Sequence, residues 1–360
     1  MKFALVGAGW RAAFYYRAAR AMEWLEICCV VEKNKDTAEK VKKIWGIPVA
    51  EDIEEAMLYH PEFFALCLPP KVLSEMICRI SQYDVPVLSE TWASDSVENM
   101  VSLYNRTKGK RIRVSEQYAY QPMHSARLAV IQSGILGEVR HVHVSAAHGY
   151  HGVALIRKYL SAGFEECTVE GRTFFVKAVE GPGRQGWSDR QRFHEEKQEL
   201  VVFSYNGKWA ILDFTGEQYF SPFRCSRILV RGESGEIEQE KVCYLTENYP
   251  ECIKFSLHRD YSGWDNSLGR TGTIAITGNG TFYYKNIFGA KGLSDEETAV
   301  AASLYKMVHY VKTGEGGYSL EEELQDQYLA WMAQEAIRTG EKIKCRRMPW
   351  SDEKEREDGR

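Results

Sequence analysis

The chain has 360 residues, more than one hydrophobic core usually supports, so two domains are predicted. Its 44% hydrophobic and 27% charged residues are typical of a globular protein in water. A formal net charge of −4 gives no general attraction to nucleic acid or to an anionic membrane, and no apolar stretch is long enough to span a bilayer. The nine cysteines form no Cys-x-x-Cys pair, which argues against a structural zinc site and favours reduced thiols in a cytoplasmic protein.

Short apolar runs alternate with helical patterns over the first third of the chain. The runs are typical of buried strands, with predicted bounds 2–6, 25–31, 63–68, 85–88 and 112–115. Helices are predicted between them, up to about residue 22 and at 37–45, 51–58, 72–81 and 96–107. Strands and helices that alternate at this spacing predict a parallel, doubly wound sheet. We therefore expect an α/β domain over residues 1–122.

The pattern changes after residue 122. A helix is predicted at 123–133, followed by strands at 139–146, 173–179, 200–205, 209–214, 273–277 and 281–285. Two of the intervening turns, Asn206-Gly207 and Gly278-Asn279-Gly280, are hairpin signals. Two helices that begin at capping boxes close the pattern. Residues 123–345 are therefore predicted to form an α+β domain with a large, mostly antiparallel open sheet, followed by a charged tail at 346–360.

One predicted strand of this second domain is apolar on both faces. Residues 200–203 read Leu-Val-Val-Phe, whereas a strand with one solvated face would alternate polar and apolar residues. We expect the second face to be covered, either by helices or by a partner subunit. A homodimer or homotetramer through the C-terminal sheet is the corresponding prediction.

A glycine turn follows the first predicted strand. Residues 7–12 have the spacing G-x-G-x-x-A, with Gly7 for the tight turn, Gly9 for close approach to a pyrophosphate, and a small Ala12 for helix packing. The next strand ends at Glu32, where a carboxylate would accept the ribose hydroxyls of NAD. Lys33 beside it would tolerate the extra phosphate of NADP. The motif predicts a Rossmann domain that binds NAD, with NADP as the alternative.

At this point the sequence resembles the Gfo/Idh/MocA oxidoreductases over nearly its whole length. The segments that carry the resemblance, besides the glycine turn, are 67–70, 116–122, 133–139, 231–237 and 314–340. The resemblance implies a substrate-binding and oligomerisation domain after the Rossmann domain. The candidate cofactor-binding residues are Gly7, Gly9, Trp10, Arg11, Glu32, Lys33, Leu68, Pro69, Glu90, Thr91 and Gln117.

The sequence departs from the family at two functional motifs. The family's Glu-Lys-Pro is here Glu90-Thr91-Trp92, so the lysine that the resemblance would place near nicotinamide and substrate is absent. In the family's Asp-x-x-x-His motif, Ala147 stands at the aspartate position and His151 at the histidine position. We therefore expect a histidine that has lost its acidic companion.

Hydride transfer from an alcohol needs a base for the hydroxyl proton, and the unperturbed pKa of histidine lies near neutrality. His151 is therefore the candidate base; the alternative is a residue at a helix start that bonds only to the backbone. The candidate catalytic residues are His151, Tyr118 and Lys158, and the candidate substrate-binding residues are His148, Tyr150 and Arg157. A metal site at His141 and His143 lacks a third ligand in the sequence, so no metal is expected.

The leading functional hypothesis is an NAD(P)-dependent oxidoreductase that acts on the hydroxyl of a sugar, glycoside or cyclitol. A second hypothesis, redox-assisted glycoside cleavage, has the same cofactor oxidise the sugar transiently and then return the hydride. A third hypothesis is a nucleotide-binding sensor without catalysis, which the missing lysine and aspartate favour.

Overall fold

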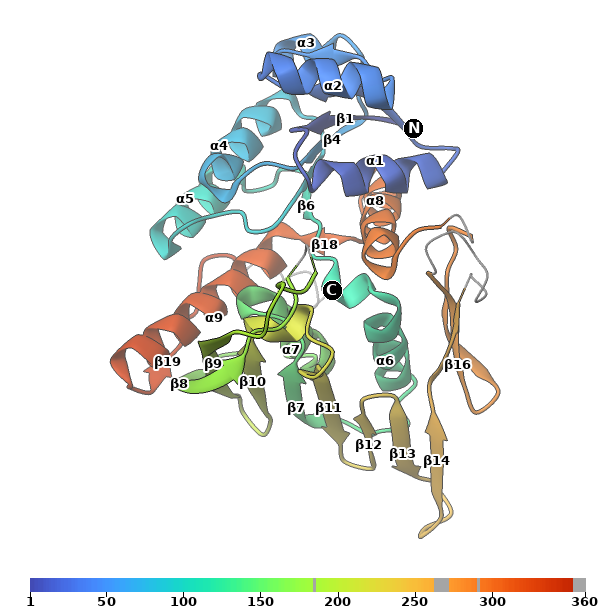
Figure 1. The fold of residues 1–360 in the computed structure, drawn as a ribbon, viewed down its shortest axis with the longest axis vertical. Coiled ribbons are helices and arrows are strands. Elements are labelled where there is room, and N and C mark those ends of the chain that lie inside the picture. Colours follow the sequence, from blue (N-terminus) through green and yellow to red (C-terminus); the bar gives the residue numbers. More distant parts are fainter. Residues whose placement is uncertain (184–185, 262–271, 290–291, 352–360) are drawn as a thin grey trace.

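The structure of the chain is a computed structural model that describes residues 1–183, 186–261, 272–289 and 292–351. Figure 1 shows an N-terminal α/β layer above a large open sheet, with helices from the C-terminal part of the chain between and beside them. This arrangement confirms the predicted fold class, a doubly wound parallel sheet followed by a largely antiparallel one.

The described N-terminal strands form a seven-stranded sheet in the order β18-β6-β5-β4-β1-β2-β3. All neighbours are parallel except β18, which runs antiparallel to β6. The strands are β1 (Lys2–Val6), β2 (Glu26–Val31), β3 (Val49–Ala50), β4 (Phe63–Leu66), β5 (Val87–Ser89), β6 (Ile112–Val114) and β18 (Tyr318–Ser319). The helices are α1 (Ala12–Ala21), α2 (Lys35–Trp45), α3 (Ile53–Met57), α4 (Pro70–Ile80) and α5 (Val97–Thr107), with the short η1 (Ser81–Tyr83).

Both faces of this sheet are buried, as its uninterrupted apolar strands require. In β1, Phe3 and Leu5 belong to a core shared with α1, whereas Ala4 and Val6 belong to a core shared with α4 and α5. The first core is completed by α8 (Asp295–Thr313), which packs against α1 although it lies almost 300 residues further along the chain. The C-terminal segment therefore stabilises the N-terminal sheet.

The second sheet has nine described strands in the order β14-β13-β12-β11-β7-β10-β9-β8-β19, and only the β7–β10 pair is parallel. The strands are β7 (Val139–Ser145), β8 (Thr168–Val179), β9 (Phe193–Ser204), β10 (Trp209–Thr215), β11 (Arg227–Gly232), β12 (Gly235–Glu238), β13 (Lys241–Leu245), β14 (Cys252–Ser256) and β19 (Ile343–Lys344). A separate three-stranded sheet contains β15 (His258–Tyr261), β16 (Thr273–Gly278) and β17 (Thr281–Lys285). The remaining elements are α6 (Pro122–Gln132), α7 (Gly149–Leu160), α9 (Leu320–Thr339), η2 (Tyr118–Tyr120) and η3 (Gly216–Tyr219).

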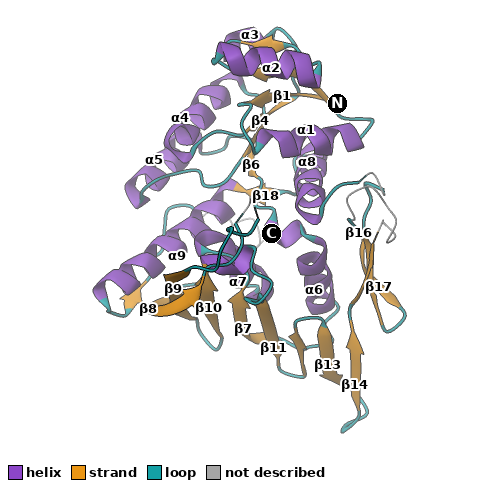
Figure 2. Cartoon of the chain, viewed as in Figure 1, coloured by secondary structure: helices purple, strands orange, loops and turns teal. Residues whose placement is uncertain are grey.

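One face of the large sheet is covered by helices, α7 over β7 and β10 and α9 over β8 (Figure 2). Val201 and Phe203 point to that face and are buried, whereas Leu200 and Val202 point to the other face and are only partly buried. On that second face His141 of β7 stacks on Trp209 of β10, with ring centroids 3.8 Å apart. Its apolar side chains remain partly exposed in the single chain.

The segment predicted as the start of a charged tail is partly built into the fold. Trp350 is fully buried, packs edge-on against Tyr104 and Tyr328, and donates a 2.9 Å hydrogen bond from Nε1 to Oε1 of Gln325. The prediction of a tail from residue 346 is therefore wrong for residues 346–351, because a single tryptophan anchors them between α5 and α9. Residues 352–360 lie outside the described part of the chain.

Candidate functional site

A cavity of about 1170 Å³ lies between the N-terminal sheet and the helices on the second sheet. Its upper wall is formed by loops that follow the carboxyl ends of β1, β2, β4, β5 and β6, the edge at which doubly wound sheets bind ligands. Its other walls come from the start of α7, from η3 and from one face of α9. The cavity thus joins the predicted nucleotide-binding turn to residues of the second domain.

The glycine turn has the shape that a dinucleotide requires. Gly7 has φ +90°, and a Cβ there would lie 2.6 Å from the carbonyl oxygen of Cys67, so only glycine fits between β1 and β4. A Cβ at Gly9 would meet no described protein atom within 4 Å, and Gly9 lines the cavity. Its missing side chain therefore leaves room for a ligand at the N-terminus of α1, where backbone N–H groups favour phosphate.

Glu32 lies at the end of β2 and lines the same cavity. Its Oε1 accepts a 2.8 Å hydrogen bond from the backbone N–H of Asn34, which orients the carboxylate. The position matches that expected for an acid that accepts ribose hydroxyls. Lys33 is exposed and does not line the cavity.

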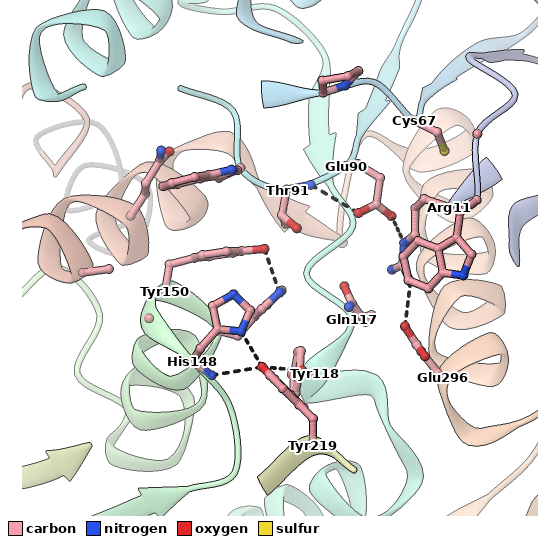
Figure 3. Close-up of a pocket in the computed structure, with 18 of the residues that line it drawn as sticks. Arg11, Cys67, Glu90, Thr91, Gln117, Tyr118, His148, Tyr150, Tyr219 and Glu296 are labelled. Carbon is pink, nitrogen blue, oxygen red and sulfur yellow. Dashed lines mark hydrogen bonds and ion pairs between the residues drawn. The ribbon is translucent and has the colours of Figure 1, made fainter. Parts of the chain in front are cut away.

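A partly buried ion-pair network connects the turn to the end of β5. Nε of Arg11 donates to Oε1 of Glu90 at 2.8 Å, and its Nη1 donates to Oε1 of Glu296 on α8 at 2.9 Å. Tyr15 also donates to Glu90, at 2.7 Å. Glu90 therefore holds the guanidinium of Arg11 in place at the cavity. Nη2 of Arg11 is buried and has no hydrogen-bond partner among the described residues. This free Nη2 donor suits an anionic group of a cofactor, and Figure 3 shows Arg11, Glu90 and Glu296 on one side of the cavity.

His151 stands at the centre of a hydrogen-bonded chain. Its Nδ1 lies 2.7 Å from Oε2 of Glu116, and its Nε2 lies 2.8 Å from the hydroxyl of Tyr150. A carboxylate only accepts, so Nδ1 carries the proton and Nε2 accepts from Tyr150. Glu116, which is 1% exposed, is held in turn by the backbone N–H of Tyr118 at 3.0 Å. We call Glu116, His151 and Tyr150 the proton relay.

The relay corrects one expectation from the sequence. Ala147 leaves the aspartate position of the motif empty of charge, but His151 has an acidic partner all the same. That partner is Glu116, which comes from the loop after β6 rather than from the turn before α7. The acidic partner of His151 is therefore supplied by a different segment of the chain from the one the motif indicates.

Tyr150 is the member of the relay that reaches Thr91, the residue at the position of the missing lysine. Burial, and then the charge of Glu116, raise the pKa of the Tyr150 phenol well above 10, while a hydrogen bond from Thr91 opposes that rise. Figure 3 shows the two side chains converging across the cavity. A neutral Thr91 orients the phenol but supplies no positive charge.

His148 and Tyr118 form a second group beside the relay. The hydroxyl of Tyr219 contacts Nδ1 of His148 and lies 3.3 Å from the hydroxyl of Tyr118, and Tyr118 packs on the ring of His151 at 4.4 Å. Partial burial, followed by the nearby His151, lowers the pKa of His148 to about 4. His148 is therefore neutral at pH 7 and is suited to hydrogen bonding rather than to accepting a proton.

Two of the catalytic and substrate-binding candidates, like Lys33 among the cofactor candidates, are not brought to the cavity. Arg157 is 3% exposed and forms ion pairs with Asp326 and Glu322 on α9. Lys158 pairs with Glu322 at 3.3 Å. Both side chains leave the far end of α7 and fasten it to α9, because the helix turns them away from its cavity-facing start. We do not retain them in the proposed site.

The cavity also contains residues that the sequence did not single out. Glu116 lay within a recognised segment, but nothing in its spacing paired it with a histidine 35 positions away. Among the further lining residues not foreseen as site residues, those with larger side chains are Trp92, Gln121, Gln218, Tyr219, Phe220, Glu296, Gln327, Trp331 and Gln334, together with Ala330 on α9. Most come from η3 and α9, whose place beside the Rossmann domain is set by tertiary packing.

Metal binding and membrane spanning were the subject of two further predictions. Within the part of the chain that the structure describes, no group of three His, Cys, Asp or Glu side chains is placed to hold a metal ion. His143 instead lies 3.5 Å from Asp213 on the partly exposed sheet face. None of the described helices is both long and apolar enough to cross a membrane.

The parallel sheet, the glycine turn and the acid at the end of β2 define a dinucleotide-binding Rossmann domain. Residues 1–118 match the family model GFO_IDH_MocA, described as an oxidoreductase family with an NAD-binding Rossmann fold. Residues 1–118 of this chain therefore match the Gfo/Idh/MocA oxidoreductase family, which confirms the predicted resemblance and the predicted NAD-binding domain.

Solved structures extend the likeness in fold to the whole chain. An oxidoreductase from Agrobacterium radiobacter, in complex with NAD+, L-tartaric acid and magnesium, has a TM-score of 0.70 at 16% identity, covering 96% of this chain and 98% of its own. Levoglucosan dehydrogenase in complex with NADH has a TM-score of 0.70 at 13% identity, covering 97% and 100%. A myo-inositol dehydrogenase from Corynebacterium glutamicum ATCC 13032 has a TM-score of 0.65 at 13% identity, covering 96% and 99%. A sequence comparison with curated proteins gave no match.

Proposed function

We propose that the protein is an NAD-dependent oxidoreductase that oxidises a hydroxyl group of a sugar, glycoside or cyclitol by hydride transfer. The supporting observation is that Tyr150 and His151 of the proton relay line the same cavity as the glycine turn and Glu32. Hydride transfer from an alcohol needs a hydride acceptor and a proton acceptor side by side, and this cavity offers a place for each.

The relay supplies the proton-accepting part of the reaction. A nicotinamide dinucleotide held by the glycine turn and Glu32 would supply the hydride acceptor. Tyr150 accepts the hydroxyl proton at its oxygen while it donates its own proton to Nε2 of His151, so the phenol stays neutral throughout. Glu116 stabilises the imidazolium that results, because its carboxylate already bonds to Nδ1. No charged side chain is then needed at Thr91 to remove the proton.

A carbohydrate-like substrate fits the chemistry of the remaining lining. The lining residues at Trp92 and on α9 are uncharged and include aromatic rings and carboxamides. Such surfaces pack against ring faces and bond to hydroxyl groups. Structural neighbours of the same fold include levoglucosan dehydrogenase and a myo-inositol dehydrogenase. Their names specify a sugar derivative and a cyclitol as substrates.

The test is incubation of the purified protein with NAD+ and a panel of sugars, glycosides and cyclitols, with NADH absorbance and product mass followed together. The proposal expects NADH to accumulate with a product that is lighter by two hydrogen atoms. Cleavage products without net NADH would instead support redox-assisted cleavage. Binding of NAD+ without change in any substrate of the panel would support a nucleotide-binding sensor.

We also propose that the partly exposed face of the large sheet forms a homodimer or homotetramer interface. Leu200, Val202, Ile211, Leu229 and Trp209 lie partly or fully exposed on this face of a single chain. Covering them would remove apolar surface from water. Light scattering at micromolar concentration is expected to give at least twice the mass of the chain, and a monomer would contradict the proposal.

A further inference from the structure

The end of the cavity furthest from Arg11 has features that neither the cofactor nor the proton relay uses. It is lined by Trp92 and by one face of α9, which contributes Gln327, Ala330, Trp331 and Gln334. In Figure 3 the ribbon of α9 lies beyond Tyr150 and Thr91, on the opposite side of the cavity from Arg11 and Glu296. We call these five residues the α9 subsite.

Gln327 is held in a single orientation within this subsite. The side chain is 1% exposed, and its Nε2 donates a hydrogen bond to the carbonyl oxygen of Ser94. Its Oε1 is buried and accepts no hydrogen bond from any residue that the structure describes. A buried carboxamide oxygen without a partner lowers the stability of a folded protein by about 1 to 3 kcal/mol. A ligand that donates a hydrogen bond to this oxygen would remove that cost.

Trp331, one helical turn further along α9, has the complementary group. Its indole Nε1 is buried and likewise has no hydrogen-bond partner in the described chain. Residues four apart lie on the same face of a helix, and Gln327 and Trp331 both line the cavity. A hydroxyl group both donates and accepts hydrogen bonds, and it can satisfy both atoms at once.

Aromatic rings complete the subsite, and no charged side chain lines it. Trp92 is 38% exposed, and its ring is nearly parallel to that of Tyr150, with 6.3 Å between centroids. The charged residues that line the cavity, Arg11, Glu32, Glu90 and Glu296, all belong to the nucleotide side. A neutral ring that carries hydroxyl groups matches flat aromatic walls with one donor and one acceptor.

We propose that the α9 subsite binds a second, hydroxylated ring of the substrate, beyond the ring that is oxidised beside Tyr150. The preferred substrate is then a glycoside, with either a second sugar or a hydroxylated aryl group, and not a free monosaccharide or cyclitol. This inference rests on the proposed function and deepens it. It assigns specificity to Trp331 and Gln327, which take no part in the proton relay.

The experiment compares matched ligands by calorimetric titration into NADH-saturated protein, in which the ligands bind without being oxidised. Each set, built on glucose, galactose or mannose, contains the methyl glycoside, the hydroxyphenyl glycoside and a disaccharide with that sugar at its non-reducing end. The subsite predicts that a second ring tightens binding about tenfold in at least one set, and the two ring-bearing ligands distinguish an aryl group from a sugar. Equal affinity for all three members of every set that binds would overturn the inference and leave the proposed function standing.

Trp331→Phe removes the indole donor and keeps an aromatic ring. It is expected to lower the ratio of second-ring affinity to methyl glycoside affinity about fivefold, the effect of one neutral hydrogen bond. Trp24→Phe is the matched control, because Trp24 is 45% exposed and does not line the cavity. An unchanged ratio in Trp331→Phe would overturn the inference, and thermal melts check that both variants fold. Failure of every carbohydrate to bind would overturn the proposed function together with the inference.

Discussion

The two ends of the cavity are built in different ways. The nucleotide end is shaped by backbone, with the positive φ of Gly7, the open side of Gly9 and the N-terminus of α1 lying within six consecutive positions. The proton-transfer end is assembled from side chains of separate segments, Glu116 after β6, His151 on α7 and Thr91 after β5. A site that the backbone shapes needs particular residues at consecutive positions. A side chain that contributes to a site can instead come from any segment that the fold brings close to it.

The carboxylate beside His151 illustrates this difference. The residue at the motif's acidic position is Ala147, yet Glu116 delivers a carboxylate to Nδ1 from 35 residues upstream. The sequence motif shows that the aspartate is absent at position 147 but does not reveal Glu116. Glu116 reaches His151 only because α7 packs against η2. The predictions below test whether the side-chain end works as a unit and whether the backbone end works without it.

The largest effect is expected from removing members of the relay. Tyr150→Phe and His151→Ala should each lower kcat by about 10² to 10⁴, because positioned proton transfer contributes that much. The dissociation constant of NAD+ should change little, since neither residue belongs to the glycine turn. Steady-state kinetics and NAD+ titration measure the two quantities, with Tyr83→Phe on the exposed surface as the matched control. Full turnover in either variant would remove that residue from the mechanism.

Next in size is a pH effect on stability at Glu323, the α9 carboxyl that accepts from the backbone N–H of Ala93 next to Trp92. Burial raises the pKa of Glu323 from 4.5 to about 8. Between those pH values the folded protein holds a proton that the unfolded chain has lost, so stability is greatest below pH 4.5 and falls as the pH rises to 8.

In the wild type this group alone should cost about 4 kcal/mol of unfolding free energy between pH 5 and pH 8, at about 1.4 kcal/mol per unit. Glu323→Gln keeps an oxygen that can accept from Ala93 and cannot titrate, so its denaturation curves should lack that loss. Urea denaturation of both proteins at a series of pH values measures the difference. Parallel pH dependence of the two proteins would show that Glu323 is ionised in the fold.

The glycine turn at the nucleotide end is tested by two alanine substitutions, one where the added methyl group meets protein atoms and one where it does not. Gly7→Ala would place a Cβ 2.6 Å from the carbonyl oxygen of Cys67 at a positive φ, and should lower stability by about 2 kcal/mol. Gly9→Ala meets no described protein atom and should keep the melting temperature, while NAD+ binding weakens at least tenfold because the methyl group enters the ligand's space. Equal effects of both changes on stability and on binding would contradict this division.

Much of the fold and half of the site could be predicted from the sequence for the same physical reason. Strand-helix alternation and the glycine turn are local patterns, so the parallel sheet is predicted correctly, and Gly7, Gly9 and Glu32 all line the cavity at its edge. The strands β11 to β14 were not predicted, because their short runs mix polar and apolar residues. Trp350 looked like part of a solvated tail, and only the tertiary structure shows the pocket that holds it.

The smallest effect concerns the choice of nucleotide at Glu32. The carboxylate at the end of β2 would repel the extra phosphate of NADP, and Lys33 beside it is exposed and available to a phosphate. Glu32→Ser should shift the ratio of NAD+ to NADP+ affinity about tenfold towards NADP+, roughly the 1.4 kcal/mol of one modest charge interaction. Titration with both nucleotides measures the ratio, and an unchanged ratio would show that Glu32 does not contact the ribose.

The central claim is that Glu116, His151 and Tyr150 move the proton as one unit. A double-mutant cycle on the single-turnover rate of NADH formation tests it, with Glu116→Gln, Tyr150→Phe and the double variant, each saturated with NAD+. Residues that act as a unit are strongly non-additive, so the double variant should be no slower than the slower single variant. A double variant slowed by the product of the two single effects would show that Glu116 and Tyr150 act independently, and would contradict the relay.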